Sequence, residues 1–297
     1  MASLRDTIRE ITRKHLEENN SMIMGQCLSA VGWVNGTVPD TQGVVELPMT
    51  DVAGADIACG VAITGRRPIL VLRFQDFLLL NGNALAIFAA KRKEIFQKSC
   101  PLFVRALAKE GNGTGNSHSG KLHSTFMHFP GLRIWAPITP NEYQACWDDF
   151  MQHDDPTICF EHRSTFDNEE EFKNLITPNA DITVFAISLA RINAKEAVGQ
   201  LWKEGVICNL IAIPQLKPFT LSNESIDCLE QSGRGLVVDT GYETCGAARD
   251  IAYQYSVANN VIIEAMGLKE VSAGVARGKE NLTPSAEEIM VKVKSML

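Results

Sequence analysis

The sequence lacks both long apolar runs and clusters of one charge. No stretch approaches the roughly 18 uninterrupted apolar residues of a membrane-spanning helix. The longest basic run is the three residues 91–93, and the formal net charge is -7. A basic stripe for nucleic acid and a segment that spans a membrane are therefore not expected.

The pattern of cysteines and histidines gives no metal or disulfide motif. Eight cysteines are scattered along the chain without a CxxC pair, and the six histidines are not spaced with them as a zinc site requires. The N-terminal residues 1–19 are charged and have helical periodicity, without the apolar core of a signal peptide. We expect reduced, buried thiols in a cytoplasmic protein.

The composition and the order of elements predict an α/β fold. At 297 residues, 45% hydrophobic and 21% charged, the chain has room for two ordinary soluble domains. Strand-like and helix-like segments alternate, which indicates two open, mostly parallel sheets with helices on both faces. The predicted helices are residues 4–18, 52–65, 83–98, 141–152, 194–204, 223–231 and 244–258. The predicted strands are residues 21–25, 69–74, 101–105, 133–136, 157–161, 182–188, 207–212, 235–239 and 261–264.

The segment 163–180 is acidic, polar and broken by Pro178. Such a change of composition is typical of a linker between domains. We therefore predict a first domain over residues 1–165, a linker over 166–180 and a second domain over 181–297.

Two polar features stand out against the apolar segments. Asp51 precedes a tightly packed helix of small residues, where either Thr50 or Asp51 could simply cap the helix. A long loop after the strand at 101–105 carries Gly111, Gly113 and Gly115, and then three histidines. It follows the carboxyl end of a predicted parallel strand, where active-site residues are common, although a mobile surface loop would have the same composition.

Several motifs together resemble one enzyme family. ELPMTD at 46–51 is similar to that family's DTPISE-type motif, and GRRPILVLRFQDF at 65–77 to its GLRPVVEFMFADF-type run. GNSHS at 115–119, HFPGLRIWAP at 128–137 and DDPTICFEH at 154–162 follow in the family's order. The chain thus resembles the beta subunits of thiamine-diphosphate-dependent 2-oxoacid dehydrogenases (pyruvate, branched-chain and acetoin types) and the later half of transketolase. The likeness covers nearly the whole chain apart from a shortened loop around residues 28–43.

The resemblance implies roles for five side chains. Asp51 takes the place of a glutamate that hydrogen-bonds N1′ of the cofactor's aminopyrimidine ring, and Phe77 that of an aromatic that stacks on this ring. Asp51 is one carbon shorter than glutamate, a difference of about 1.5 Å. His118 matches a histidine that helps to position the 2-oxo acid and to transfer protons, and Gln26 stands where many relatives have an acid. His128 matches another family histidine, which can be purely structural.

The resemblance also implies a partner. Thiamine-diphosphate enzymes bind the diphosphate through Mg²⁺ with a GDG motif, and this sequence has none. A separate alpha subunit in an α2β2 heterotetramer is expected to supply those ligands. The implied reaction decarboxylates a 2-oxo acid and passes the acyl group on, to a lipoyl acyltransferase or, in a carboligating branch, to an aldehyde or keto sugar. A non-catalytic assembly or regulatory subunit is the alternative of another class.

Overall fold

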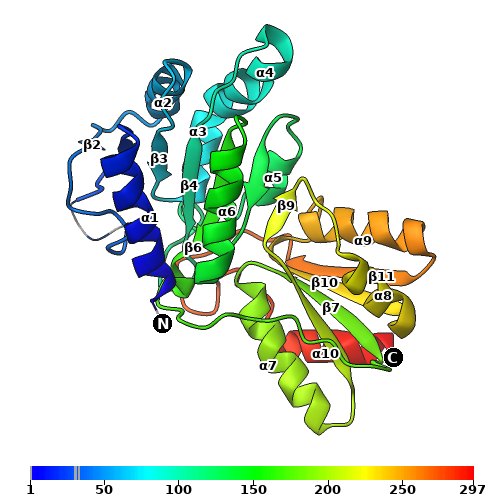
Figure 1. The fold of residues 1–297 in the computed structure, drawn as a ribbon. Helices are drawn as coiled ribbons and strands as arrows, with labels where there is room; N and C mark the ends of the chain where they lie inside the picture. Colours follow the sequence, from blue (N-terminus) through cyan, green and yellow to red (C-terminus); the bar gives the residue numbers. More distant parts are fainter. Residues whose placement is uncertain (1, 30–31, 33) are drawn as a thin grey trace. The chain divides into compact units, whose positions relative to one another are not determined.

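An open, mostly parallel sheet lies at the centre of each half of the chain (Figure 1). The computed structural model describes residues 2–29, 32 and 34–297. Contacts divide these residues into two units. The first holds the residues up to Lys109, Ser117–Glu171 and Gln215–Pro218, and the second holds Glu110–Asn116, Phe172–Pro214 and Phe219–Leu297.

The sheet of the first unit has the strand order β2-β1-β3-β4-β6-β5-β9. Its strands are β1 (Ile23–Gly25), β2 (Val44–Glu46), β3 (Ile69–Leu72), β4 (Phe103–Ala108), β5 (Arg133–Trp135), β6 (Thr157–His162) and β9 (Gln215–Lys217). All neighbours are parallel except β9, which is antiparallel to β5. Crossover connections make parallel pairs, so the predicted alternation of strand and helix is confirmed here.

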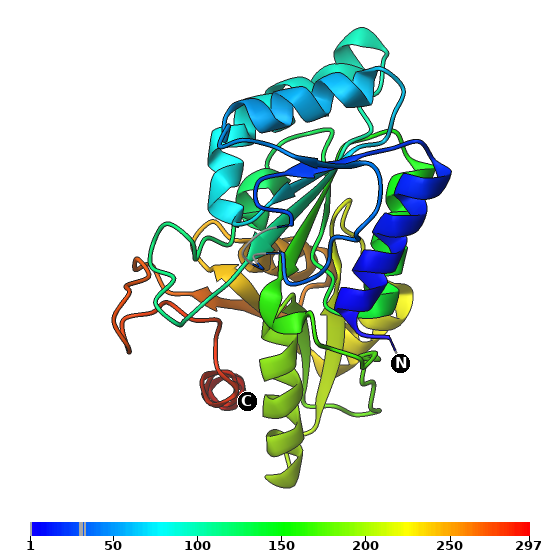
Figure 2. The same ribbon diagram turned by 90° about the vertical axis from the view of Figure 1, so that its left-hand side faces the viewer.

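Helices cover both faces of this sheet, as Figure 2 shows nearly edge-on. On one face α1 (Leu4–Glu18) packs against α6 (Pro140–Gln152). The other face carries α2 (Ala53–Ile63), α3 (Leu78–Gly82), the π-helix η2 (Asn83–Ala89) and α4 (Ala90–Phe96). The short helices η1 (Gln75–Phe77), α5 (His123–Met127) and η3 (Arg163–Thr165) complete the unit. The fold class predicted from the sequence is therefore correct.

One buried ion pair links neighbouring strands of this sheet. Arg105 on β4 donates from Nε and Nη2 to the carboxylate of Glu161 on β6, at 2.7 and 2.8 Å. Thr37 accepts from the same guanidinium at 2.8 Å, and the Tyr143 hydroxyl donates to Glu161 at 3.2 Å. Burial acts to lower the pKa of Arg105, but the charge of Glu161 and its hydrogen bonds raise it, so the guanidinium stays charged although it is buried.

The second unit has a four-stranded parallel sheet in the order β11-β10-β7-β8. Its strands are β7 (Ile182–Ile187), β8 (Cys208–Ile213), β10 (Arg234–Tyr242) and β11 (Ile262–Leu268). In Figure 1, α7 (Ala190–Lys203) and α10 (Ala286–Met296) lie on one face, and α8 (Asn223–Ser232) and α9 (Ala247–Asn259) on the other. A core of small and branched side chains joins the sheet to α7 and α10.

Several elements differ from the sequence prediction. Helix 83–98 is a π-helix followed by an α-helix, and it ends at Gln97, which has a left-handed backbone. Helix 244–258 begins only at Ala247, because Cys245 has a positive φ of 52°. The predicted crossing at 214–218 contains strand β9, whose Lys217 Nζ donates to the Met127 and Phe129 carbonyls at 2.7 and 2.5 Å. Helix α10 was not predicted, nor were β2, α3 and α5.

All eight cysteines are free thiols. Six are buried as expected, whereas Cys27 is half-buried and Cys245 is exposed. No helix in the described ranges combines the length and the apolar character needed to cross a bilayer.

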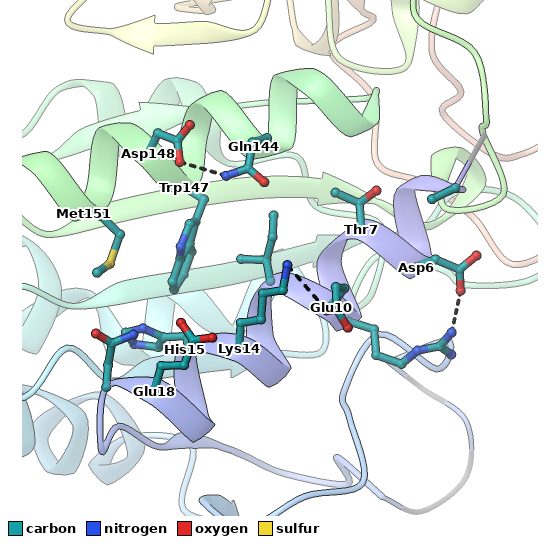
Figure 3. A pocket seen from close by; sticks show the side chains of 14 residues that line it. Asp6, Thr7, Glu10, Lys14, His15, Glu18, Gln144, Trp147, Asp148 and Met151 are labelled. Carbon is teal, nitrogen blue, oxygen red and sulfur yellow. Dashed lines mark hydrogen bonds and ion pairs between the residues drawn. The ribbon is translucent and has the colours of Figure 1, made fainter.

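A groove of about 580 Å³ runs between α1 and α6 (Figure 3). At its base lies His15, which is 2% exposed and packs edge-to-face on Trp147 at 4.8 Å. Its Nε2 donates to the Arg67 carbonyl at 2.7 Å, and its Nδ1 is buried without a partner in the described chain. Burial lowers the pKa of His15, and the charge of Arg67 acts in the same direction.

This histidine predicts a pH-dependent contribution to stability. Because the pKa in the folded state lies below the ordinary value of 6.5, acid favours the unfolded chain, which binds the proton more readily. The stability of the wild type relative to His15→Gln should therefore fall as the pH drops below about 6.5. Urea unfolding at pH 7.5 and 5.5 measures this difference. His153→Gln, at an exposed histidine, is the control, and a difference independent of pH would contradict the prediction.

Candidate functional site

Strands β1 and β3 end side by side and place polar residues at the same edge of the sheet. Gly25, the last residue of β1, pairs with Val71. A Cβ at Gly25 would lie 2.6 Å from the Val71 carbonyl oxygen, so this close approach requires glycine. The next residue along β1 is Gln26, and the residue that follows β3 is Arg73. The pairing thus places an amide and a guanidinium together.

Asp51 is not a helix cap, so the capping alternative for Thr50 and Asp51 is wrong. Helix α2 begins after Val52 without a side-chain cap, and the Thr50 hydroxyl donates to the Pro48 carbonyl. Instead the buried side chain of Asn81 accepts from the Ala55 N–H at 3.1 Å. The carboxylate of Asp51 is therefore available for other contacts.

A chain of hydrogen bonds connects Arg73, Gln26 and Asp51. Gln26 Nε2 donates to Asp51 Oδ1 at 3.1 Å, and Arg73 Nη2 donates to Gln26 Oε1 at 3.1 Å. Arg73 is 4% exposed, whereas Gln26 and Asp51 are half-buried. The structure thus brings two residues predicted from the sequence into direct contact, and an arginine that was not predicted holds one of them.

Aromatic rings form the neighbouring part of the site. Phe77, half-buried at the end of η1, lies under the Arg73 guanidinium, with 5.6 Å from Cζ to the ring centroid. The ring of His118 packs edge-to-face on Phe74 at 4.3 Å and on Phe77 at 5.9 Å. Asp51, Gln26, Phe77 and His118 therefore belong to one connected group of side chains.

Arg163, at the start of η3 and directly after β6, supports this group. Its Nη2 donates to the carbonyl of Arg73, and its guanidinium lies 4.5 Å from the Phe74 ring centroid. Burial lowers the pKa of Arg163, and the charge of Arg73 lowers it further. Two cations therefore lie near each other at this edge of the sheet.

The histidine loop is held by two side chains of η1. Asp76 accepts from the Gly120 N–H at 3.2 and 3.0 Å through its two oxygens, and Gln75 accepts from the Leu122 N–H at 2.9 Å. A Cβ at Gly120 would lie 2.6 Å from Asp76 Oδ1, so the contact also requires glycine. His118, two residues before Gly120, is positioned by these bonds.

His128 has a different environment. It is exposed at the end of α5, and its ring contacts Phe129 at 5.6 Å. The remaining histidine of the loop, His123, is buried, and its ring centroid lies 5.8 Å from that of Phe160. Of the three loop histidines, His118 is the one that packs on the aromatic rings beside Asp51.

The cavity beside these residues is small. Gln26, Asp51 and Phe77 help to line a cavity of about 20 Å³, which has room for one water molecule. Pockets that bind small molecules usually enclose at least about 300 Å³. The larger groove between α1 and α6 contains none of the predicted site residues. Among the described residues, no group of three His, Cys, Asp or Glu side chains could bind a metal ion.

Arg73 and Asn81 are site residues that the sequence prediction missed. An arginine within the apolar run ILVLRF is a visible signal, because a buried charge needs polar partners. Asn81 gives no such signal, since its role depends on the approach of α3 to the start of α2. Its Nδ2 also donates to the Phe77 carbonyl at 2.8 Å, so it holds Phe77 as well as the helix.

Comparison with protein families identifies the first unit. The model described as "Transketolase, pyrimidine binding domain" matches residues 4–168, which is more than half of the chain. The chain belongs to this family. The matched region contains all the side chains of the candidate site described above, from Gln26 to Arg163.

Three proteins similar to this chain are beta subunits of enzymes. The chain is 28% identical over 224 residues to the acetoin:2,6-dichlorophenolindophenol oxidoreductase subunit beta of Cupriavidus necator, covering 71% of this chain and 66% of the relative. It is 26% identical to the pyruvate dehydrogenase E1 component subunit beta of Gracilaria tenuistipitata, covering 84% and 83%. A third, the 2-oxoisovalerate dehydrogenase subunit beta of Bacillus subtilis, is 28% identical and covers 66% and 64%. The resemblance found in the motifs is confirmed.

Solved structures support the fold. A split-gene transketolase, described as an inactive beta4 tetramer, aligns with a TM-score of 0.74 and 16% identity, covering 99% of this chain and 97% of that chain. Transketolase from Campylobacter jejuni aligns with a TM-score of 0.77 and 18% identity, covering 99% and 46%. The transketolase-like architecture therefore extends over the whole chain.

The hydrogen bonds of Asp76 predict how firmly the histidine loop is held. In Asp76→Ala the Gly120 amide loses a half-buried, charged acceptor, and hydrogen bonds to charged groups contribute about 1.5–3 kcal/mol. Hydrogen exchange of the loop amides after Ser117 should accelerate roughly tenfold or more. Asp76→Asn, which retains one acceptor oxygen, should show a smaller change. Unchanged exchange in Asp76→Ala would mean that the loop is held by other contacts.

Proposed function

We propose that this chain is the beta subunit of a two-chain thiamine-diphosphate-dependent enzyme that decarboxylates a 2-oxo acid and transfers the acyl unit to an acceptor. The observation that carries the proposal is the connected group of Asp51, Gln26, Phe77 and His118 within the transketolase-type pyrimidine-binding domain. The names of the relatives, beta subunits of pyruvate, acetoin and 2-oxoisovalerate enzymes, support the same class of reaction.

The residues at the site fit the pyrimidine half of the cofactor. Asp51 offers a half-exposed carboxylate to a ring nitrogen, and Phe77 offers a half-exposed aromatic face. When bound, thiamine diphosphate supplies the electron sink for decarboxylation. In this proposal His118 positions the 2-oxo acid and exchanges protons with it; its contacts with the rings of Phe74 and Phe77, in a loop that Asp76 holds, support this role.

The other half of the cofactor site requires a second chain. The cavity of about 20 Å³ cannot enclose a cofactor, and the sequence has no GDG motif for Mg²⁺ and diphosphate. An alpha subunit in an α2β2 heterotetramer is the partner that would complete the site. The surface that it would cover is rich in exposed apolar side chains near Asp51 and Phe77: Met49, Val52, Leu79 and Leu80.

The proposal predicts that Asp51→Ala abolishes C2 proton exchange of bound thiamine diphosphate. The chain is mixed with its alpha subunit, thiamine diphosphate and Mg²⁺, and exchange of the C2 proton for deuterium is followed by NMR. Removing the carboxylate removes the partner of the aminopyrimidine. Asp56→Ala, at an exposed acid on α2, is the matched control and should exchange like the wild type. Exchange at the wild-type rate in Asp51→Ala would refute the assignment.

The same mixture tests the class of reaction. Release of CO₂ from a panel of 2-oxo acids is measured with three acceptors: a redox dye, a lipoyl domain and a short aldehyde. Acyl transfer to the lipoyl domain supports a dehydrogenase with an acyltransferase partner, and product formation only with the aldehyde supports carboligation. Cofactor binding without CO₂ release from any substrate would overturn the catalytic proposal in favour of an assembly or regulatory subunit.

A further inference from the structure

Arg73 is a buried cation next to the proposed cofactor site. It follows β3, is 4% exposed, and its Nη1 donates to the Cys27 thiol at 3.5 Å, in addition to the bond from Nη2 to Gln26 Oε1. The side chain of Arg163 donates a hydrogen bond to the carbonyl oxygen of Arg73 and so holds the backbone at Arg73. The backbone of Cys27 is left-handed, with φ of 54°, a conformation that costs a non-glycine residue free energy. The surrounding chain therefore fixes both ends of the Arg73–Cys27 contact.

We propose that Arg73 is a positioning residue that acts on Asp51 through the amide of Gln26. A guanidinium carries only hydrogen-bond donors, so the group of Gln26 that faces Arg73 must be Oε1. The NH₂ end of the amide then has to face Asp51, where Nε2 lies 3.1 Å from Oδ1. This inference rests on the proposed function, because the orientation of Gln26 matters for activity only if Asp51 binds the cofactor.

The orientation of the amide determines what Asp51 can do. With Arg73 in place, Gln26 donates to Asp51 and occupies Oδ1, while Oδ2 accepts no hydrogen bond from the described residues. If the amide turned by half a rotation, its oxygen would face the carboxylate and the two acceptors would repel each other. Arg73 therefore holds Asp51 in one orientation, as a carboxylate with a single oxygen open to a further donor.

A purely structural role for Arg73 is the competing explanation, and NMR of the full chain without cofactor separates the two. The side-chain NH₂ signals of Gln26 are assigned with Gln26→Leu, and their exchange with water is measured. In the wild type these protons should exchange roughly tenfold or more slowly than those of an exposed glutamine, as expected for a bond to a charged acceptor. In Arg73→Met this protection should be lost, whereas Arg73→Lys, which keeps a donor, should retain most of it.

The control is Arg67→Met, which removes a partly buried arginine just before the opposite end of β3 and should leave the Gln26 signals unchanged. Protection that persists in Arg73→Met overturns the inference. If Arg73→Met does not fold, the wild type alone tests the inference. Gln26 side-chain protons that exchange as fast as those of an exposed glutamine would overturn it.

A second readout connects the arrangement to the cofactor. In the complex with the alpha subunit, C2 proton exchange of bound thiamine diphosphate should slow about tenfold in Arg73→Met and change less than threefold in Arg73→Lys, both measured well below the melting temperature of each variant. Equal rates of C2 proton exchange in the wild type and in Arg73→Met would overturn the inference that Arg73 acts on Asp51. Failure of the wild-type complex to bind cofactor would refute the proposed function instead, while the NMR result on the free chain still decides the role of Arg73.

Discussion

The parallel pairing of β1 with β3 is the constraint on which the site depends. Glycine at position 25 permits an approach to Val71 that any side chain would prevent. This approach sets the carboxyl ends of the two strands side by side, so that Gln26 and Arg73 meet within hydrogen-bond distance. In open α/β sheets the ends of neighbouring parallel strands form the usual ligand-binding edge, and here they carry an amide, a carboxylate and two cations.

At this edge, the side chains with structural roles are not the side chains with proposed chemical roles. Asn81 binds the free N–H of Ala55 and the carbonyl of Phe77, and this leaves Asp51 out of the capping of α2. Asp76 holds the histidine loop by its backbone, and this leaves the His118 ring to pack on Phe74 and Phe77. The residues with a proposed chemical role are therefore half-exposed, and those that support them are buried or bonded to backbone.

Much of the fold follows from local patterns in the sequence. Helix α1 was predicted with its observed bounds because its apolar positions recur with helical period, and the structure adds a cap by Ser3 at its start. Helix α10 was missed although Ser285 and Glu288 form a capping box, a signal that local reading could have used. Strand β9 could not be found this way, because three residues pair with a strand some 80 positions earlier and nothing local specifies that pairing.

Only part of the site could be predicted from the sequence. Motif resemblance indicated Asp51, Gln26, Phe77 and His118, and the structure connects all four, although their chemical roles stay predictions. Asn81 acts only through tertiary contacts, which no spacing in the sequence reveals, whereas Arg73 is visible as a charge inside an apolar run but its partners are not. The two departures from the family motifs, the shorter acid at 51 and the amide at 26, are joined by a hydrogen bond, and Arg73 binds the amide.

We propose that this chain supplies one half of a cofactor site and that a second chain supplies the other. Calorimetric titration of thiamine diphosphate, with Mg²⁺ present, into the chain alone and into its complex with the alpha subunit tests this claim most directly. The account predicts saturable binding to the complex and affinity at least a hundredfold lower for the chain alone, roughly 2.7 kcal/mol. Equal affinity for the chain alone would contradict it.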